Sequence, residues 1–232
     1  MEVAKIETFS DYQMDEQAPG LSKVRQEAFF PTMVFNCDIE DADGFNASLI
    51  ESINAEKAKD EAGLHRSNVP KLGGWHSHNN LHQLNNFSGL RDAIHKAAAV
   101  LGERLGYDNN YPLTIDQMWS IINPPGSFNK SHIHPGYLWS GVYYVQTPKN
   151  SGGISFTDPR TTNLMMTPKY AKGKRPKESW TSVNYDPIAG RMLIFPAWMY
   201  HAVALNEATK SADQDEVDRI CVAFNLVQDV IN

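Results

Sequence analysis

The C-terminal half of the chain is a succession of short β-forming segments separated by turn residues. Eight such segments follow Tyr111, with Pro, Gly or Asn between them: Leu113–Ile122, His132–His134, Trp139–Gln146, Gly153–Phe156, Trp180–Asn184, Gly190–Phe195, His201–Leu205 and Arg219–Val227. Closely spaced short strands with turn signals between them are typical of antiparallel sandwiches and barrels. The pattern predicts a jelly-roll β core over residues 111–228.

The first half of the chain has a helical pattern instead. In Leu90–Leu105, apolar residues recur at steps of three and four, and Asp41–Glu61 has the same character, so we predict a helix in each segment. Phe29–Ile39 is rich in β-forming residues and is a predicted strand. We therefore expect a mainly β protein whose N-terminal helices, within residues 41–106, pack on one sheet.

The length of 232 residues suits one domain with a sizeable core. Residues 1–28 are polar with weak periodicity, so we expect an N-terminal arm there and a single jelly-roll domain over residues 29–232. The predicted strand Phe29–Ile39 has two interpretations that the sequence leaves open. It pairs within the barrel, or it is an edge strand that pairs across a homodimer.

Charge and cysteine content narrow the classes of function. Lys and Arg number 21 and Asp and Glu 27, giving a net charge of −6, which argues against binding nucleic-acid phosphates or anchoring on an anionic membrane. Cys37 and Cys221 lie far apart and suggest no disulfide framework. We find neither a membrane-span-sized apolar run nor the pattern of a signal peptide. We therefore expect a soluble, cytoplasmic protein without a nucleic-acid or membrane partner.

Two histidines within one predicted strand are the first candidate metal ligands. His132 and His134 lie two residues apart, and residues two apart on a strand point to the same face. Imidazole is a ligand that suits Fe, Zn, Cu and Ni. A His-x-His pair also arises often by chance, so two ordinary surface or barrel-lining histidines are the alternative.

A third histidine and an arginine strengthen the metal hypothesis. His201 follows an apolar strand and a Pro-containing turn, and a jelly-roll can return this strand beside the one that carries His134. In the last strand, Arg219, Cys221, Ala223 and Asn225 share one face, and Ile220, Val222, Phe224 and Leu226 the other. Arg219 is thus placed to grip a carboxylate at a barrel mouth. The alternative is a surface ion pair with the acidic loop Asp213–Asp218.

The order of these residues resembles that in Fe(II)/2-oxoglutarate-dependent oxygenases: His-x-(Asp or His), then a distal His, then an Arg that opens the last strand. Within that superfamily, the sequence is similar to an uncharacterised branch of 2OG-Fe(II) oxygenases. The resemblance spans roughly residues 29–227 and rests on the following stretches: Gly74–Ser77, Met118–Asn123, Pro124–Gly136, Ser140–Val145, Ser151–Arg160, Phe195–His201 and Arg219–Asn225.

The resemblance implies a double-stranded β-helix with one iron ion at its open end. His132 and His201 then correspond to two iron ligands, and Arg219 to the basic residue that pairs with the far carboxylate of 2-oxoglutarate. Tyr144 corresponds to a tyrosine that hydrogen-bonds the same carboxylate. The implied enzyme uses Fe(II), 2-oxoglutarate and O2 to hydroxylate a small-molecule or peptide substrate.

The sequence departs from the superfamily at His134, where a carboxylate ligand is usual. His134 is therefore the third predicted ligand, and three neutral ligands leave Fe(II) with its full 2+ charge. Asn123, Asn129 and Arg160 are candidates for contacting substrate or supporting the metal ligands, although Arg160 also suits a structural ion pair. A second metal site formed by His76, His78 and His82 is a weaker hypothesis.

Two alternatives to this oxygenase stay open. One is a cupin-like enzyme with three histidine ligands that does not use 2-oxoglutarate, and the other is a jelly-roll binding module without catalysis. Arg219 separates the first alternative from the oxygenase, because only an enzyme that binds 2-oxoglutarate needs a buried clamp for a carboxylate. Metal binding separates the second alternative from the oxygenase, because a binding module without catalysis would leave the histidine site empty.

Overall fold

The computed structural model describes residues 10–12, 24–26, 29–160, 162, 165–212 and 214–228. The chain divides into two units, residues 1–33 and 34–232. In the first unit, β1 (Ser10–Tyr12) and β2 (Val24–Gln26) pair as an antiparallel ribbon. The rest of the predicted arm at 1–28 lies outside the described residues, and the arm stays a prediction.

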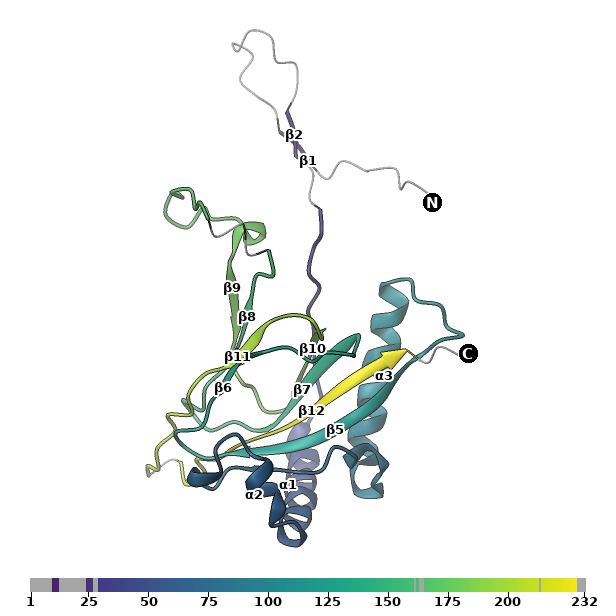
Figure 1. The fold of residues 1–232 in the computed structure, drawn as a ribbon, viewed down its shortest axis with the longest axis vertical. Coiled ribbons are helices and arrows are strands. Elements are labelled where there is room, and N and C mark those ends of the chain that lie inside the picture. Colours follow the sequence, from purple (N-terminus) through teal and green to yellow (C-terminus); the bar gives the residue numbers. More distant parts are fainter. Residues whose placement is uncertain are drawn as a thin grey trace. The chain divides into compact units, whose positions relative to one another are not determined.

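The second unit contains a six-stranded antiparallel sheet (Figure 1). Its order is β3 (Phe35–Asp38), β10 (Arg191–Pro196), β7 (Trp139–Gln146), β12 (Arg219–Gln228), β5 (Leu113–Asn123) and β4 (Trp75–His76). The predicted strand at 29–39 is thus shorter than expected and begins at Phe35. It pairs with β10 and forms one border of the sheet, so the pairing within the barrel is observed.

A smaller, four-stranded antiparallel sheet completes the β core. Its order is β6 (Asn129–His132), β11 (His201–Val203), β8 (Ile154–Thr157) and β9 (Ser182–Tyr185). From β5 onward, the strands of one sheet alternate in sequence with those of the other, except that β8 and β9 follow one another in the smaller sheet, so the chain passes repeatedly between the two sheets. This alternation is the jelly-roll predicted from the eight segments.

Two long helices cover one face of the larger sheet (Figure 1). Helix α1 (Ala42–Lys59) packs on β7, and α3 (Ser88–Arg104) packs on β5. Buried apolar side chains at helical spacing form this contact: Leu49 and Ile53 in α1, and Leu90, Ile94 and Leu101 in α3. The prediction that the N-terminal helices pack on one sheet is confirmed. Among the described residues, no helix combines the length and apolarity that crossing a membrane requires.

Short elements connect the helices to the sheet. They are α2 (Ala62–Arg66), η1 (Pro70–Leu72), η2 (Leu81–Gln83) and η3 (Asn85–Phe87), and η5 (Lys177–Ser179) precedes β9. Trp75 anchors this region, since its buried ring lies against Gly63 and its Nε1 donates to the Asp60 carbonyl at 3.0 Å. A Cβ atom on Gly63 would lie only 2.1 Å from that ring, so glycine is required there.

Strand β12 shows how the larger sheet separates the core from a cavity. Its residues Ile220, Val222, Phe224 and Leu226 join the apolar core beneath the helices. The intervening Arg219, Cys221 and Ala223 line a cavity between the sheets. The alternation predicted for this strand is therefore observed, and the face with the small side chains leaves room for a site.

Candidate metal centre

His132 and His201 meet because two strands of the smaller sheet bring them into register. His132 ends β6, His201 begins β11, and the two residues are direct antiparallel partners. Their ring centroids lie 4.2 Å apart. A tight turn places His201 there, since the Met199 amide donates to the Pro196 carbonyl at 2.9 Å, which turns the chain from the larger sheet into the smaller one.

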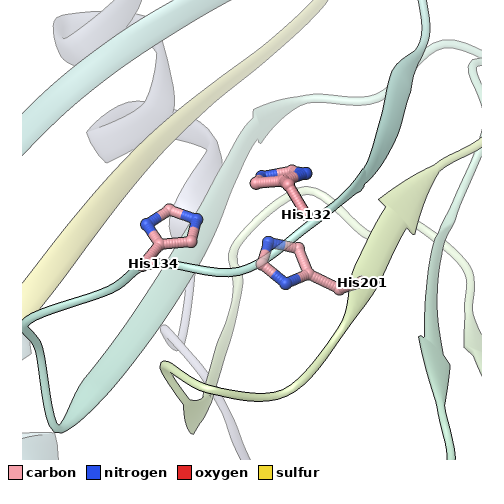
Figure 2. A group of neighbouring side chains, drawn as sticks. All are labelled: His132, His134 and His201. Carbon is pink, nitrogen blue, oxygen red and sulfur yellow. The ribbon is translucent and has the colours of Figure 1, made fainter.

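His134 joins this pair from outside the strand. Its ring centroid lies 5.3 Å from that of His132 and 5.2 Å from that of His201 (Figure 2). One ligand atom from each of the three side chains lies within 4.8 Å of the others. The expectation that His132 and His134 share a strand is wrong, because β6 ends at His132. The His134 amide instead donates to the Ala197 carbonyl at 2.9 Å, which fixes the backbone beside the turn.

Hydrogen bonds determine which nitrogen each ring offers. His132 Nδ1 lies 2.7 Å from the Lys130 carbonyl, and His201 Nδ1 lies 3.0 Å from the Met199 carbonyl. A carbonyl oxygen only accepts, so each Nδ1 carries the proton and each Nε2 keeps a free lone pair. Such orienting bonds are typical of metal-binding histidines.

Burial keeps two of the imidazoles neutral. It lowers the pKa of His134 to about 4, with a further contribution from neighbouring His132. It lowers the pKa of His201 to about 4 as well. Only the neutral ring can donate a lone pair to a metal, so both side chains are in the ligand form at neutral pH.

Among the residues that the structure describes, Arg219 is a buried cation without a carboxylate partner. The residue is 1% exposed, and its Nη1 donates to the carbonyls of Ser151 and, at 3.0 Å, Gly152. Its Nη2 is buried and has no hydrogen-bond partner among the described residues. Asp215, Glu216 and Asp218 are the described members of the acidic loop, and no ion pair joins any of them to Arg219. The alternative of a surface ion pair therefore gains no support.

The three histidines and Arg219 line one cavity of about 210 Å³. Tyr144, the other residue that we expected to contact 2-oxoglutarate, also lines it and is 2% exposed. Burial raises the pKa of Tyr144, so its hydroxyl keeps its proton and can donate. The sequence-predicted ligands and carboxylate contacts thus all border the same space.

The other predicted residues separate into two groups. Asn123 and Asn129 line the cavity. Arg160 does not, and its Nε donates to Asp158 Oδ1 at 3.0 Å on the surface, as the ion-pair alternative expected. Among the described residues, the group of His132, His134 and His201 is the only one of its kind that could hold a metal, so the second site at His76–His82 is not formed.

One wall of the cavity was not predicted from the sequence. Arg66, Asn68, His76 and Trp119 form it, from the region between α2 and β5. His76 stacks on Trp119 with ring centroids 5.9 Å apart, and Trp119 stacks on His134 at 5.9 Å. The signal for His76 was present in the stretch Gly74–Ser77, whereas nothing in the local sequence marks Arg66.

The donor set fits an iron ion and 2-oxoglutarate. Three converging imidazoles are a borderline-soft nitrogen set suited to Fe(II), and they leave coordination positions for other ligands. The orphaned Nη2 of Arg219 is a buried donor that needs an acceptor, and a carboxylate is the acceptor that satisfies a guanidinium best.

Comparison with known proteins agrees with this fit. Residues 117–225 match the family described as "Putative 2OG-Fe(II) oxygenase". No curated protein matches the chain. Among solved structures, a prolyl-4-hydroxylase from Pseudomonas putida has 13% identity and a TM-score of 0.57, with 84% of this chain and 93% of that chain covered.

Two further structures were solved with a metal ion and 2-oxoglutarate bound. The epimerase SnoN from nogalamycin biosynthesis, in complex with Fe3+, alpha ketoglutarate and nogalamycin RO, has 15% identity and a TM-score of 0.57 over 84% of this chain and 79% of that one. HygX from Streptomyces hygroscopicus, with nickel and 2-oxoglutarate bound, has 11% identity and a TM-score of 0.51 over 84% and 82%.

These likenesses establish the double-stranded β-helix fold predicted above. The fold class predicted from the sequence is confirmed, and the family match over residues 117–225 agrees with the resemblance found in the sequence. Residues 117–225 carry the sequence signature of 2OG-Fe(II) oxygenases, and the chain has the fold of enzymes that use iron and 2-oxoglutarate.

Proposed function

We propose that the protein is an Fe(II)- and 2-oxoglutarate-dependent oxygenase that hydroxylates a substrate bound beside His132, His134 and His201. One observation carries the proposal. The cavity that gathers three imidazoles also contains the Arg219 guanidinium, whose buried Nη2 lacks a partner among the described residues. A cavity that only held a metal would have no need for a buried, unpaired cation, because burying one costs several kcal/mol.

The chain would hold both groups with residues from different segments. His132, His134 and His201 would bind the iron through ring nitrogens, and Arg219 and Tyr144 would hold the far carboxylate of 2-oxoglutarate. When bound, iron and 2-oxoglutarate supply the oxidation of a substrate C–H bond by O2. Tyr144 contributes a protonated hydroxyl, and Arg219 is fixed in place by the carbonyls of Ser151 and Gly152.

The protein would also orient the ligands and exclude water. The carbonyls of Lys130 and Met199 hold the rings of His132 and His201 so that Nε2 faces the cavity. Apolar side chains of Ile154 and Phe195 line the same space. A dry, preorganised site strengthens electrostatic interactions and protects reactive groups from water.

The three neutral ligands distinguish this site from one with a carboxylate. A carboxylate would cancel one unit of the iron charge, and His134 does not, so the iron would keep its full 2+ charge. We expect weaker retention of the metal and a changed redox potential as a result. These properties also fit the cupin-like alternative, so the binding of 2-oxoglutarate has to be measured directly.

The test is an anaerobic titration of the apoprotein with Fe(II) and then 2-oxoglutarate, followed by visible absorbance, with Arg219→Ala alongside. We expect a charge-transfer band that saturates in the wild type and weakens in the variant. Iron binding without a band in the wild type would favour the cupin-like enzyme. No iron binding would favour the binding module.

We also place the protein in the cytoplasm and keep the homodimer as a hypothesis. Exposed Cys37 and buried Cys221 are both free thiols, as expected in a reducing compartment. Strand β3 borders the larger sheet and pairs with β10 on one side, so its other side is the edge that a second copy would use. Sedimentation velocity of the full chain tests the homodimer.

A further inference from the structure

We propose that the substrate of this site carries an oxyanion, such as a carboxylate or a phosphate, and that Arg66 binds it. The inference rests on the function proposed above and specifies its substrate class. It depends on the charges that line the cavity, on the geometry of Arg66 and on the balance of charge around the metal.

The described residues that line the cavity include two arginines and neither an aspartate nor a glutamate. Arg219 lies at the start of β12, and Arg66 ends α2 on the wall formed with Asn68, His76 and Trp119. The other titratable groups contribute no negative charge. Burial raises the pKa of Cys221 to about 11 and raises that of Tyr144, so both stay protonated.

Two nitrogens of the Arg66 guanidinium already have hydrogen-bond partners, and the third can bind a ligand. Its Nε donates to the His76 carbonyl at 3.2 Å, and its Nη2 forms an ion pair with Asp60, which does not line the cavity. Nη1 has no hydrogen-bond partner among the described residues, and the side chain is 30% exposed. An arginine fixed through two nitrogens is preorganised, so binding a ligand at the third costs little conformational entropy.

The balance of charge around the metal explains why the site would favour an anionic substrate. In a site with two histidines and one carboxylate, the charges of the metal, the carboxylate, 2-oxoglutarate and one arginine cancel. His134 replaces that carboxylate here, and one positive charge is left uncompensated. The cavity also has apolar walls, such as Ile154 and Phe195, and uncompensated charge beside them is unfavourable and attracts a counter-charge. An anionic substrate supplies it, and Arg66 is the free donor on the open wall.

The wall around Arg66 suits a polar, compact group. Asn68 adds an amide, and His76 Nδ1 lies 2.7 Å from the Ser77 carbonyl, so its Nε2 is an acceptor. The stacked rings of His76 and Trp119 make this wall flat. Together these groups offer donors to the oxyanion and one acceptor to a neighbouring hydroxyl or amine.

The experiment uses probes small enough to enter any such cavity. The anaerobic protein loaded with Fe(II) and 2-oxoglutarate is titrated with acetate, with inorganic phosphate and with acetamide, the neutral analogue of acetate. The shift of the charge-transfer band reports binding near the metal. We expect at least one of the two anions to bind about tenfold more tightly than acetamide, because a charged acceptor strengthens hydrogen bonds to arginine. The anion that binds more tightly identifies the class as carboxylate or phosphate.

Variants of Arg66 distinguish an anion bound to this arginine from an anion bound to the metal. Arg66→Gln should weaken binding of the anion about tenfold, while its 2-oxoglutarate band stays intact, and Arg66→Lys should retain part of the affinity. Arg160→Ala is the matched control, since Arg160 is also paired with a carboxylate but lies outside the cavity. Melting curves check that each variant is folded.

Three outcomes would overturn the inference: neither anion shifts the band, acetamide binds as tightly as both anions, or Arg66→Gln binds the anion like the wild type. The last outcome would mean that the anion binds the iron directly. All three leave the proposed function standing, because the 2-oxoglutarate band still forms. If no band forms in the wild type, the proposed function fails first.

Discussion

The two sheets differ in what covers them, and the candidate site is divided along that difference. The larger sheet is sealed on one face by α1 and α3, and its strands β7 and β12 are almost wholly buried. The smaller sheet has short strands that are only half-buried, such as β6 and β9. Arg219 and Tyr144 lie on the larger sheet, whereas His132 and His201 lie where strands of the smaller sheet end or begin.

The difference suggests that the two sheets contribute different parts of the site. The larger, helix-covered sheet would hold the cosubstrate contacts, and the smaller sheet would hold two of the three metal ligands, His132 and His201. The predictions below separate these two contributions, beginning with the largest expected effect.

Removing a metal ligand should cost more metal affinity than removing the arginine. We expect His201→Ala to weaken Fe(II) binding on the order of 100-fold or more, because loss of even an outer partner of a metal ligand costs 10–100-fold. Arg219→Ala should keep the metal and lose the 2-oxoglutarate band. His95→Ala, an exposed histidine on α3, is the control. Anaerobic equilibrium dialysis measures the metal, and equal losses in His201→Ala and Arg219→Ala would contradict the division.

A side chain at Gly141 should destabilise the larger sheet. A Cβ atom there would lie 2.1 Å from Phe224 Cζ, and the Phe224 ring is fully buried between β12 and the helices. We expect Gly141→Ala to lower the free energy of unfolding by about 1–3 kcal/mol through overpacking. Gly44→Ala, in α1 with open space around it, should instead stabilise by up to about 1 kcal/mol. Urea unfolding of both variants tests whether the free energy of unfolding falls in Gly141→Ala and rises in Gly44→Ala.

Acidification should destabilise the metal-free protein through its buried histidines. The pKa of His134 and of His201 is about 4 in the folded protein, against an ordinary value of 6.5. Between these values the unfolded chain binds more protons, so stability falls as the pH drops from 6.5 towards 4. We expect the free energy of unfolding to fall by about 2 kcal/mol over this range. This figure is reduced from the full pKa difference because His134 is partly exposed. Denaturant unfolding of wild type and of His134→Asn/His201→Asn at several pH values measures it, and an unchanged pH dependence in the double variant would refute it.

The ion pair at the border of the larger sheet should contribute little. Arg191 donates to both carboxylate oxygens of Asp38, at 2.7 and 2.8 Å, and joins β10 to β3. The bonds from Arg191 lower the pKa of Asp38, so this stability is present at neutral pH and is lost as acid protonates the carboxylate. Because the Asp38 side chain is 55% exposed, we expect a coupling energy of about 0–1 kcal/mol from a double-mutant cycle. A coupling well above that range would show that the edge strand depends on this pair.

The larger sheet and its helices were the most predictable part of the molecule. Spacing alone located the helix at 90–105, observed as α3, and alternation assigned both faces of β12, because each pattern directly reflects which side is buried. The strand predicted at 29–39 is longer than the observed one, since the β-forming residues before Phe35 have no partner strand in the larger sheet.

The site was predictable in its ligands and not in its walls. His132, His134 and His201 come together as proposed, but through cross-strand register and a turn rather than a shared strand. Arg219 could be placed on the cavity face, whereas its carbonyl partners at Ser151 and Gly152 belong to a loop whose path no local pattern encodes. Arg66 was missed for the same reason, because only the packing of α2 beside β4 brings it to the cavity.

The most direct test of the central claim is a crystal structure of the protein grown anaerobically with Fe(II) and 2-oxoglutarate, with anomalous diffraction at the iron edge. We predict a single ion bound by one nitrogen each of His132, His134 and His201, with the far carboxylate of 2-oxoglutarate on Arg219. An ion bound elsewhere, or a carboxylate side chain in place of His134, would contradict that claim.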